Sequence, residues 1–235
     1  MTLHILKVGG KVIDDLALLR PILESFLQKE GKKIIVHGGG KKASELSEKL
    51  GIAVQMVNGR RITDSASLEV ATMGYAGLFN KQIVALLQSL GGNALGLSGA
   101  DGNVMLAHRR PVKEIDYGFV GDLDAINAPA IQRLLSAEFT PVFCAITHDG
   151  QGQLLNTNAD TIASSLATAM SGLYEVKLYL CLDKNGVLAN PADDNSVIPS
   201  MNATDYERFK AEGVVYAGML PKLDNAFDAL RQGVK

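Results

Sequence analysis

The chain has 235 residues, of which 47% are hydrophobic and 20% charged, and its formal net charge is −2. These proportions are ordinary for a globular protein and argue against disorder. The small charge supplies no basic field for nucleic acid or for an anionic membrane, so we expect neither partner.

No apolar run reaches the roughly 20 residues that cross a bilayer, and no signal-peptide pattern precedes the first apolar run. The cytoplasm is therefore the expected location. Cys144 and Cys181 each lie inside an apolar, strand-like run without a Cys or His at metal-binding spacing. Both are predicted to be reduced core thiols.

Two strand-to-helix turns rich in glycine open the chain. The first predicted strand covers residues 3–8 and runs into Gly9 and Gly10, with Lys7 just before them. A helix follows as far as Leu27, and Gly31 is expected to cap it. The alternation of strands and helices predicts a mainly parallel sheet, in which ligands bind beyond the carboxyl ends of the strands.

The second strand, residues 33–37, ends in Gly38, Gly39 and Gly40 and gives way to helical spacing. Bare backbone N–H groups at the positive end of a helix dipole suit a phosphate or a carboxylate. This turn alone leaves open that glycine serves only for its backbone angles. A second, parallel turn beside it favours an anion site.

Residues 52–62 have the pattern of a β-hairpin around Asn58-Gly59, and Thr63 or Asp64 is placed to cap the helix that follows. From about Asp64 to Leu90 no proline occurs, and apolar residues trace one unusually long helix. Glycines within it fit either an oligomer contact or a bent core helix.

The remaining elements continue the alternation, with a polar excursion up to about Asp122 that is predicted to form small antiparallel strands outside the main sheet. A second lobe is predicted from residue 173, with the sheet continuing into it. The other predicted strands cover residues 94–98, 140–146 and 176–182, and the other helices cover residues 128–136, a segment opened by 154–160, residues 205–212, and the chain from about Leu223.

Several familiar sites are excluded by spacing. The second glycine turn is not a P-loop, and no dinucleotide fingerprint or partnered nucleophile occurs. The histidines lack zinc spacing and are expected to be structural; they are His4, His37, His108 and His148. What remains is a set of strand-end lysines, glycines, an arginine and carboxylates, which suits phosphoryl transfer because that reaction needs mainly positioning and positive charge.

The motifs Lys-x-Gly-Gly, His-Gly-Gly-Gly, Asn-Gly-x-Arg-x-Thr, Asn-x-Asn-Ala-Asp and Gly-Met-x-x-Lys follow one another in this order. Over essentially the whole chain this order resembles the amino-acid kinase superfamily and, within it, the N-acetylglutamate kinases of arginine biosynthesis. The resemblance implies an αβα sandwich in which residues 1–172 hold the acylated amino acid and residues 173–235 hold ATP, with Mg²⁺ bound through the nucleotide and no metal ligand from the protein.

By matching positions, the resemblance implies that Lys7 and Lys222 flank the transferred phosphoryl group and that Asp160 orients them. Gly10 and Gly39 would supply N–H groups to that phosphoryl group. Asp160 could alternatively serve only to cap the helix that follows it, and the two roles can coexist. Three more expectations concern binding. Arg61 would hold a substrate carboxylate, with Asn156 and the Gly39-Gly40 backbone fixing the rest of the acid; the nucleotide would meet Asp183, Lys184, Asn185, Gly186, Val187, Leu188, Val214, Val215 and Tyr216.

Two departures from the resemblance shape further expectations. The chain starts directly at the first strand, without the N-terminal helix of arginine-inhibited relatives, so a homodimer through the Asp64 to Leu90 helix without arginine feedback is expected. It ends after the helix near Arg231, whereas relatives continue with another strand, which leaves the nucleotide site the least defined part.

The implied reaction is ATP-dependent phosphorylation of the γ-carboxylate of N-acetyl-L-glutamate. N-succinylglutamate is an alternative acceptor, because the acyl pocket is not defined by the motifs. A non-catalytic amino-acid-binding module on the same fold is the alternative from another class, and a dinucleotide-dependent oxidoreductase is more distant. Two lysines converging on one phosphoryl group favour the enzyme, since binding alone does not need both.

Overall fold

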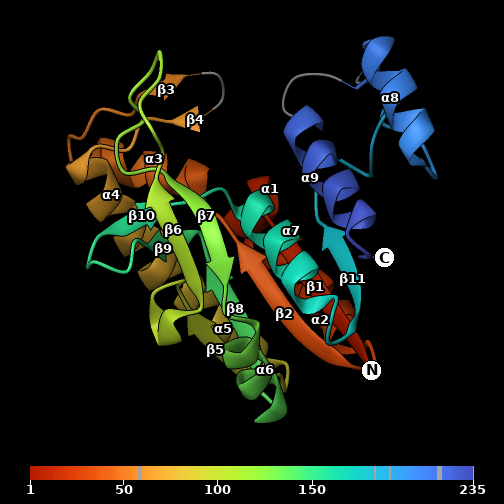
Figure 1. Cartoon of the computed structure of the whole chain (residues 1–235), viewed down its shortest axis with the longest axis horizontal. Helices are drawn as coiled ribbons and strands as arrows, with labels where there is room; N and C mark the ends of the chain where they lie inside the picture. Colours follow the sequence, from red (N-terminus) through yellow and green to blue (C-terminus); the bar gives the residue numbers. More distant parts are fainter. Residues whose placement is uncertain (58–59, 183, 191, 216–218, 235) are drawn as a thin grey trace.

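The computed structural model describes residues 1–57, 60–182, 184–190, 192–215 and 219–234. Within them, five parallel strands form the central sheet, in the order β11-β1-β2-β8-β5, and helices cover both of its faces (Figure 1). The predicted αβα sandwich is confirmed. The strands are β1 (Thr2–Val8), β2 (Lys32–His37), β5 (Ala94–Leu97), β8 (Thr140–Cys144) and β11 (Glu175–Leu180).

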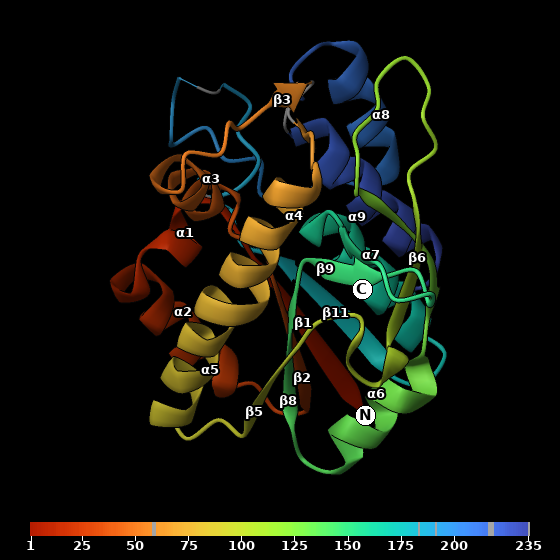
Figure 2. The same cartoon turned by 90° about the vertical axis from the view of Figure 1, so that its left-hand side faces the viewer.

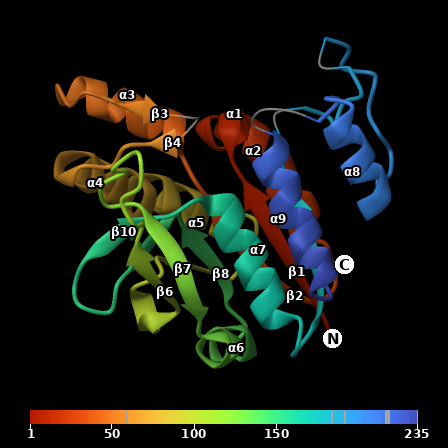
Figure 3. The ribbon, with the colours of Figure 1, turned by 45° about the horizontal axis from the view of Figure 1, so that its top comes forward.

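Alternation along β1 and β2 divides their side chains between two cores, because successive residues of a strand point to opposite faces. Leu3 and Ile5 pack with α7 (Ala159–Met170) and α6 (Ala128–Ser136), whereas Leu6 and Val8 pack with α2 (Leu16–Leu27) and α5 (Asn80–Ser89). Figure 3 shows α7 and α9 (Leu220–Arg231) side by side on the first of these faces.

Strand β11 pairs with β1 in parallel, from Thr2 opposite Glu175 to Lys7 opposite Leu180. The sheet therefore crosses the predicted lobe boundary after Gly172, as expected. Beyond β11 the chain forms α8 (Ala203–Ala211) before it returns through α9. The hairpin of β3 (Met56–Val57) and β4 (Arg60–Arg61) stands on the opposite side of this end of the sheet from α8 (Figures 1 and 3).

The polar excursion forms a second, small sheet, as predicted. Antiparallel β6 (Met105–Arg109) and β7 (Gly121–Ile126) join β9 (Ile146–His148) and β10 (Leu154–Asn156) there. The expected strand 140–146 is in fact two strands, because the chain leaves the main sheet after β8 and enters the small sheet as β9. The hairpin prediction is confirmed by the β3–β4 pairing, although Asn58 and Gly59 themselves lie outside the described residues.

The long predicted helix is present as a single rod in Figure 2, but its middle is π-helical. It comprises α4 (Ser65–Thr72), the π segment η1 (Met73–Phe79) and α5. The Asp64 side chain accepts from Ser67 N at 2.8 Å, so Asp64 is the cap. A π segment inside a helix inserts an extra residue in one turn and often marks a functional site.

Three smaller predictions need correction. Helix α2 ends at Leu27 with Gln28 as its C-cap, so Gly31 does not cap it; with φ 118°, Gly31 turns the chain into β2. Helix α9 begins at Leu220 rather than Leu223, since Pro221 fits a first helical turn, where its missing N–H is not needed. Cys144 is a free, buried thiol as expected, but Cys181 is only partly buried rather than a core residue.

The described part of the chain contains no helix long and apolar enough to span a membrane.

Candidate active site

Two lysines from opposite ends of the chain meet at one carboxylate. Lys7 Nζ lies 2.8 Å from Asp160 Oδ1, and Lys222 Nζ lies 3.1 Å from Asp160 Oδ2. Lys7 closes β1 on the side of Leu3 and Ile5, so strand alternation turns it toward α7. Asp160 and Lys222 lie in the first turns of α7 and α9.

The cap of α7 is Asn158, not Asp160. The Asn158 side chain accepts from Asp160 N at 2.8 Å and from Thr161 N at 3.1 Å. That Asp160 caps the helix was the alternative prediction, and it is wrong, because the neighbouring asparagine already satisfies these backbone donors. The Asp160 carboxylate is left to hold the two lysines.

Two of the three charged groups in this ion-pair cluster are buried. Lys7 and Asp160 are each only 7% exposed, whereas the Lys222 side chain is 31% exposed. Burial alone would raise the pKa of Asp160, but the ammonium groups of Lys7 and Lys222 outweigh it and hold that pKa below its ordinary value. Asp160 is therefore ionised at neutral pH, and the cluster carries one net positive charge.

Gly9 makes room for the Lys7 ammonium. A Cβ atom at Gly9 would lie 2.5 Å from Lys7 Nζ, and its φ of −156° is extended backbone that any residue adopts. Glycine is needed at this position for space rather than for its backbone angles. Gly10 begins α1 (Gly10–Asp14) directly after it, at the end of β1 where the glycine turn was expected.

The second glycine turn is enclosed by the π segment and by α7. Gly39 has φ 142°, and a Cβ atom there would lie 2.6 Å from Phe79 Cδ2; a Cβ atom at Gly38 would lie 3.7 Å from Ala159 Cβ. Gly39 is the N-cap of α3 (Gly40–Lys49), which has no side-chain cap. The first N–H groups of α3 are thus open to an anion, at the positive end of the helix.

Arg61 and Asn156 lie next to this turn, but each is held by the protein. Arg61 Nη2 donates to Gly40 O at 2.8 Å and to Ser44 Oγ at 2.6 Å. Asn156 Nδ2 donates to Thr63 Oγ1 at 3.1 Å. Thr63 is fully buried and links the end of the hairpin to the segment just before β7. Its N–H donates to Tyr117 O, and its carbonyl accepts from Phe119 N.

Ser44, Thr63 and Tyr75 are the residues at this site that sequence reasoning missed. Thr63 had a signal, because it lies two residues after Arg61 and so shares its side of an extended strand. Burial raises the pKa of Tyr75 and the nearby Arg61 guanidinium opposes that shift, which places the Tyr75 hydroxyl beside Arg61. The contact between Tyr75, in the long helix, and Arg61, in the hairpin, could not be predicted from their spacing in the sequence.

The segments expected to bind the nucleotide pack against the start of α9. Val187, Leu220 and Leu223 surround a small core of Tyr206, Val215 and Phe227, whose two rings stack with centroids 4.7 Å apart. The Leu188 and Val215 side chains are buried, so they support this region, whereas Lys184 and Asn185 are exposed. Gly186 and Val214 are partly buried; Asp183 and Tyr216 lie outside the described residues.

The model of the amino acid kinase family matches residues 2–235. The chain belongs to the amino acid kinase family. Proteins named acetylglutamate kinase from Bacteroides fragilis and Cytophaga hutchinsonii are 51% and 52% identical to it, over 99% of this chain and 89% and 88% of theirs. The crystal structure of smu.665 from Streptococcus mutans superposes with a TM-score of 0.81, at 25% identity over 99% of this chain and 91% of that one.

As an amino acid kinase, the chain has a site suited to positioning a phosphoryl group rather than to acid–base chemistry. Both oxygens of Asp160 are engaged by ammonium groups, which leaves the carboxylate no role as a base. Within the described ranges, no group of three or more His, Cys, Asp or Glu side chains could hold a metal ion. A cation that accompanies a nucleotide would be held through its phosphates.

Proposed function

We propose that this chain transfers the γ-phosphoryl group of ATP to the γ-carboxylate of N-acetyl-L-glutamate, as a step of arginine biosynthesis. The observation that carries the proposal is the meeting of Lys7 and Lys222 on Asp160. The relatives named acetylglutamate kinase, at 51% and 52% identity, support this acceptor over other acids.

In the proposed reaction one γ-carboxylate oxygen attacks the γ-phosphorus, a P–O bond forms, and the bond to the departing ADP oxygen breaks. The acceptor is already ionised, so no proton moves and no general base is needed. Negative charge on the transferred group meets Lys7, Lys222 and the N–H groups of Gly10 and Gly39. By pairing with both ammonium groups, Asp160 would hold them close together beside the transferred group.

For the acceptor, we assign Arg61 to a substrate carboxylate and Asn156, with the Gly39-Gly40 backbone, to the rest of the molecule. A guanidinium binds a carboxylate through two parallel hydrogen bonds, which an ammonium does less well. The bonds of Arg61 to Gly40 O and Ser44 Oγ place it at the mouth of the glycine turn. Substrate binding would exchange one of these partners for a carboxylate oxygen.

ATP is proposed to bind along residues 183–188 and 214–216, with Mg²⁺ held through its phosphates. The packing of Val187 against Leu220 and Leu223 supports this, because it brings the segment to the helix that carries Lys222. Residues 1–172 would then be the acceptor lobe and residues 173–235 the nucleotide lobe. A homodimer through the helix from Asp64 to Leu90, located in the cytoplasm, completes the proposal.

An ADP-release assay with ATP and Mg²⁺ tests the function. N-acetylglutamate, N-succinylglutamate, glutamate and aspartate are compared at equal concentrations, and we expect the highest kcat/KM with N-acetylglutamate. Turnover of free aspartate or glutamate alone would overturn the assignment, and binding without ADP release would favour the non-catalytic module. Preference for N-succinylglutamate would correct the acyl group.

Two lysine variants provide the matched control for this assay. Lys222→Ala is expected to lower kcat by about 100-fold or more, because a positive charge that faces the negatively charged transferred group is lost. Lys177 is exposed on β11 and pairs with His4 of β1, so strand alternation places it on the opposite face of the sheet from Lys7. Lys177→Ala is therefore expected to leave kcat unchanged. Equal rates for the two variants would remove Lys222 from the mechanism.

A further inference from the structure

A buried polar chain runs behind the second glycine turn, on the face of the sheet away from Lys7. His37, the last residue of β2, is fully buried, and its Nδ1 lies 2.9 Å from Gly38 O. Its Nε2 lies 3.0 Å from Asn80 Nδ2, which also lies 2.9 Å from Val142 O. Lys81 Nζ donates to Asn80 Oδ1 at 3.2 Å.

The proton positions in this series of hydrogen bonds follow from the groups that can only donate or only accept. An ammonium can only donate and a backbone carbonyl can only accept, so Lys81 must meet Asn80 Oδ1 and Val142 O must meet Asn80 Nδ2. The amide nitrogen then donates to His37 Nε2. A neutral imidazole that accepts at Nε2 carries its proton on Nδ1, so His37 donates to Gly38 O.

The charge state agrees with this geometry. Burial lowers the pKa of His37 to about 4, with the Lys81 charge lowering it further and the bond to Gly38 opposing the shift. The ring is therefore neutral at physiological pH. Asn80 is itself 1% exposed, so neither partner can exchange its protein contacts for water.

Holding one carbonyl of the turn fixes an N–H group of the same peptide unit. The Gly38 carbonyl and the Gly39 N–H share a planar trans peptide, so they point in opposite directions. With Gly38 O bound to His37, the Gly39 N–H faces away from His37. Glycines on both sides leave this peptide free to rotate unless something holds it.

We propose that His37 and Asn80 are positioning residues for phosphoryl transfer, which orient the Gly38–Gly39 peptide so that the Gly39 N–H faces the transferred phosphoryl group. This inference rests on the proposed function. Asn80 follows directly on the π segment, so the irregular turn of the long helix sets where the amide meets the imidazole.

Two substitutions of His37 separate positioning from stability. Asparagine places an amide nitrogen near the position of Nδ1 and retains a donor for Gly38 O, whereas glutamine places its amide near Nε2 and retains only the contact with Asn80. Each variant keeps one of the two bonds, so both are expected to lose a similar amount of thermal stability. Their effects on the Gly39 N–H differ.

For His37→Gln we expect kcat to fall about tenfold or more, with KM for N-acetylglutamate and ATP changed only about twofold, since an N–H donor to the transition state is misdirected. For His37→Asn we expect kcat within about threefold of wild type. If the wild-type enzyme is active and the two variants have equal kcat values, the positioning role of His37 is overturned while the proposed function stands. A wild-type protein that turns over none of the acids would instead defeat the proposed function.

A spectroscopic measurement keeps the inference testable if both variants fold poorly. Proton–nitrogen correlation spectra of the wild-type imidazole are expected to show His37 protonated at Nδ1 and unprotonated at Nε2, and Asn80→Leu is expected to change that signal while lowering kcat. Protonation at Nε2 in the wild type would overturn the hydrogen-bond pattern, and with it the proposal.

Discussion

At the residue scale, the central feature is the Asp160 carboxylate, in which each oxygen forms an ion pair with a different lysine. Lys7 is as buried as Asp160, so neither charge can find compensation in water if its partner is removed. The cluster holds one more positive than negative charge, and that excess is available to an anionic group placed over it. Asp160 is thus the one carboxylate that both ammonium groups share.

Asp160→Asn is expected to lower the free energy of unfolding at neutral pH by about 3 kcal/mol, because the substitution leaves the buried Lys7 ammonium without its counter-charge. Turnover should fall by about 100-fold, since the two ammonium groups then repel each other away from a common point. Chemical denaturation and the ADP-release assay measure the two effects. Glu24→Gln, which breaks an exposed pair on α2, is the control and should cost about 0.5 kcal/mol or less.

The difference in free energy of unfolding between wild type and Asp160→Asn should depend on pH in a definite direction. The pKa of Asp160 in the folded protein lies below its ordinary value of 3.8. Its stabilising contribution is therefore fully present above that value and is lost as the pH falls through the folded-state pKa. The gap between wild type and Asp160→Asn should be constant from pH 7 to about pH 5 and should close in stronger acid. A gap that widens in acid would contradict the assignment.

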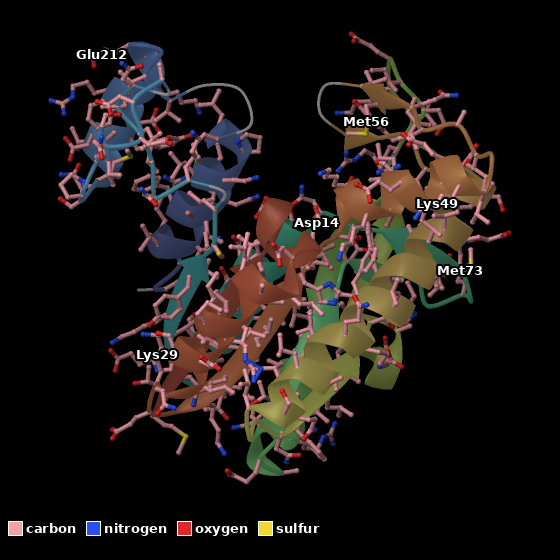
Figure 4. The ribbon with its side chains drawn as sticks, turned by 180° about the vertical axis from the view of Figure 1, so that it is seen from behind. Asp14, Lys29, Lys49, Met56, Met73 and Glu212 are labelled. Atoms are coloured by element: carbon pink, nitrogen blue, oxygen red, sulfur yellow. The ribbon has the colours of Figure 1, made fainter. Side chains whose placement is uncertain are left out.

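At the element scale, the long helix has two different sides at its π segment. Tyr75 and Phe79 are buried against the second glycine turn, where a Cβ atom at Gly39 would lie 3.3 Å from Tyr75 Cδ1 as well as 2.6 Å from Phe79. Met73 and Leu78 are each 53% exposed, and Met73 lies at the outer margin of the molecule in Figure 4. The inner side shapes the second glycine turn, and the outer side is exposed to solvent.

Gly39→Ala is expected to destabilise the protein by about 2 kcal/mol, because the new methyl group would clash with a ring and the backbone would hold a positive φ that alanine disfavours. Turnover should fall further than stability alone explains, since the turn must shift. Thermal unfolding and the ADP-release assay report both changes. Gly172→Ala, with open space around it and no positive φ, should change stability by less than about 0.5 kcal/mol.

At the scale of the whole molecule, local patterns predicted the strands and the two glycine turns, whereas the convergence of Lys7, Asp160 and Lys222 was implied by the order of motifs that resembles the amino-acid kinase superfamily. Period-two alternation and motif order carry that information along the chain. Contacts between distant elements were not predictable in the same way. Neither the bond between Arg61 and Ser44 nor the contact between Asn80 and His37 has a local signal. The division of one apolar run into β8 and β9 likewise depends on partners distant in the sequence, because β8 pairs with β2 and β5 whereas β9 pairs with β6 and β10.

The exposed outer side of the long helix is the surface proposed to join two copies of the chain in a homodimer. If this surface joins two copies, wild-type protein should sediment with twice the chain mass of 25.0 kDa. Leu78→Glu should shift the equilibrium to single chains, because closing the interface would bury an unpaired carboxylate at a cost of several kcal/mol. Leu173→Glu, at a leucine that is 48% exposed after α7, should leave the mass unchanged. Sedimentation equilibrium at several concentrations decides the matter. A wild-type protein of single-chain mass throughout, or a dimer that survives Leu78→Glu as well as Leu173→Glu, would show that this helix joins no partner.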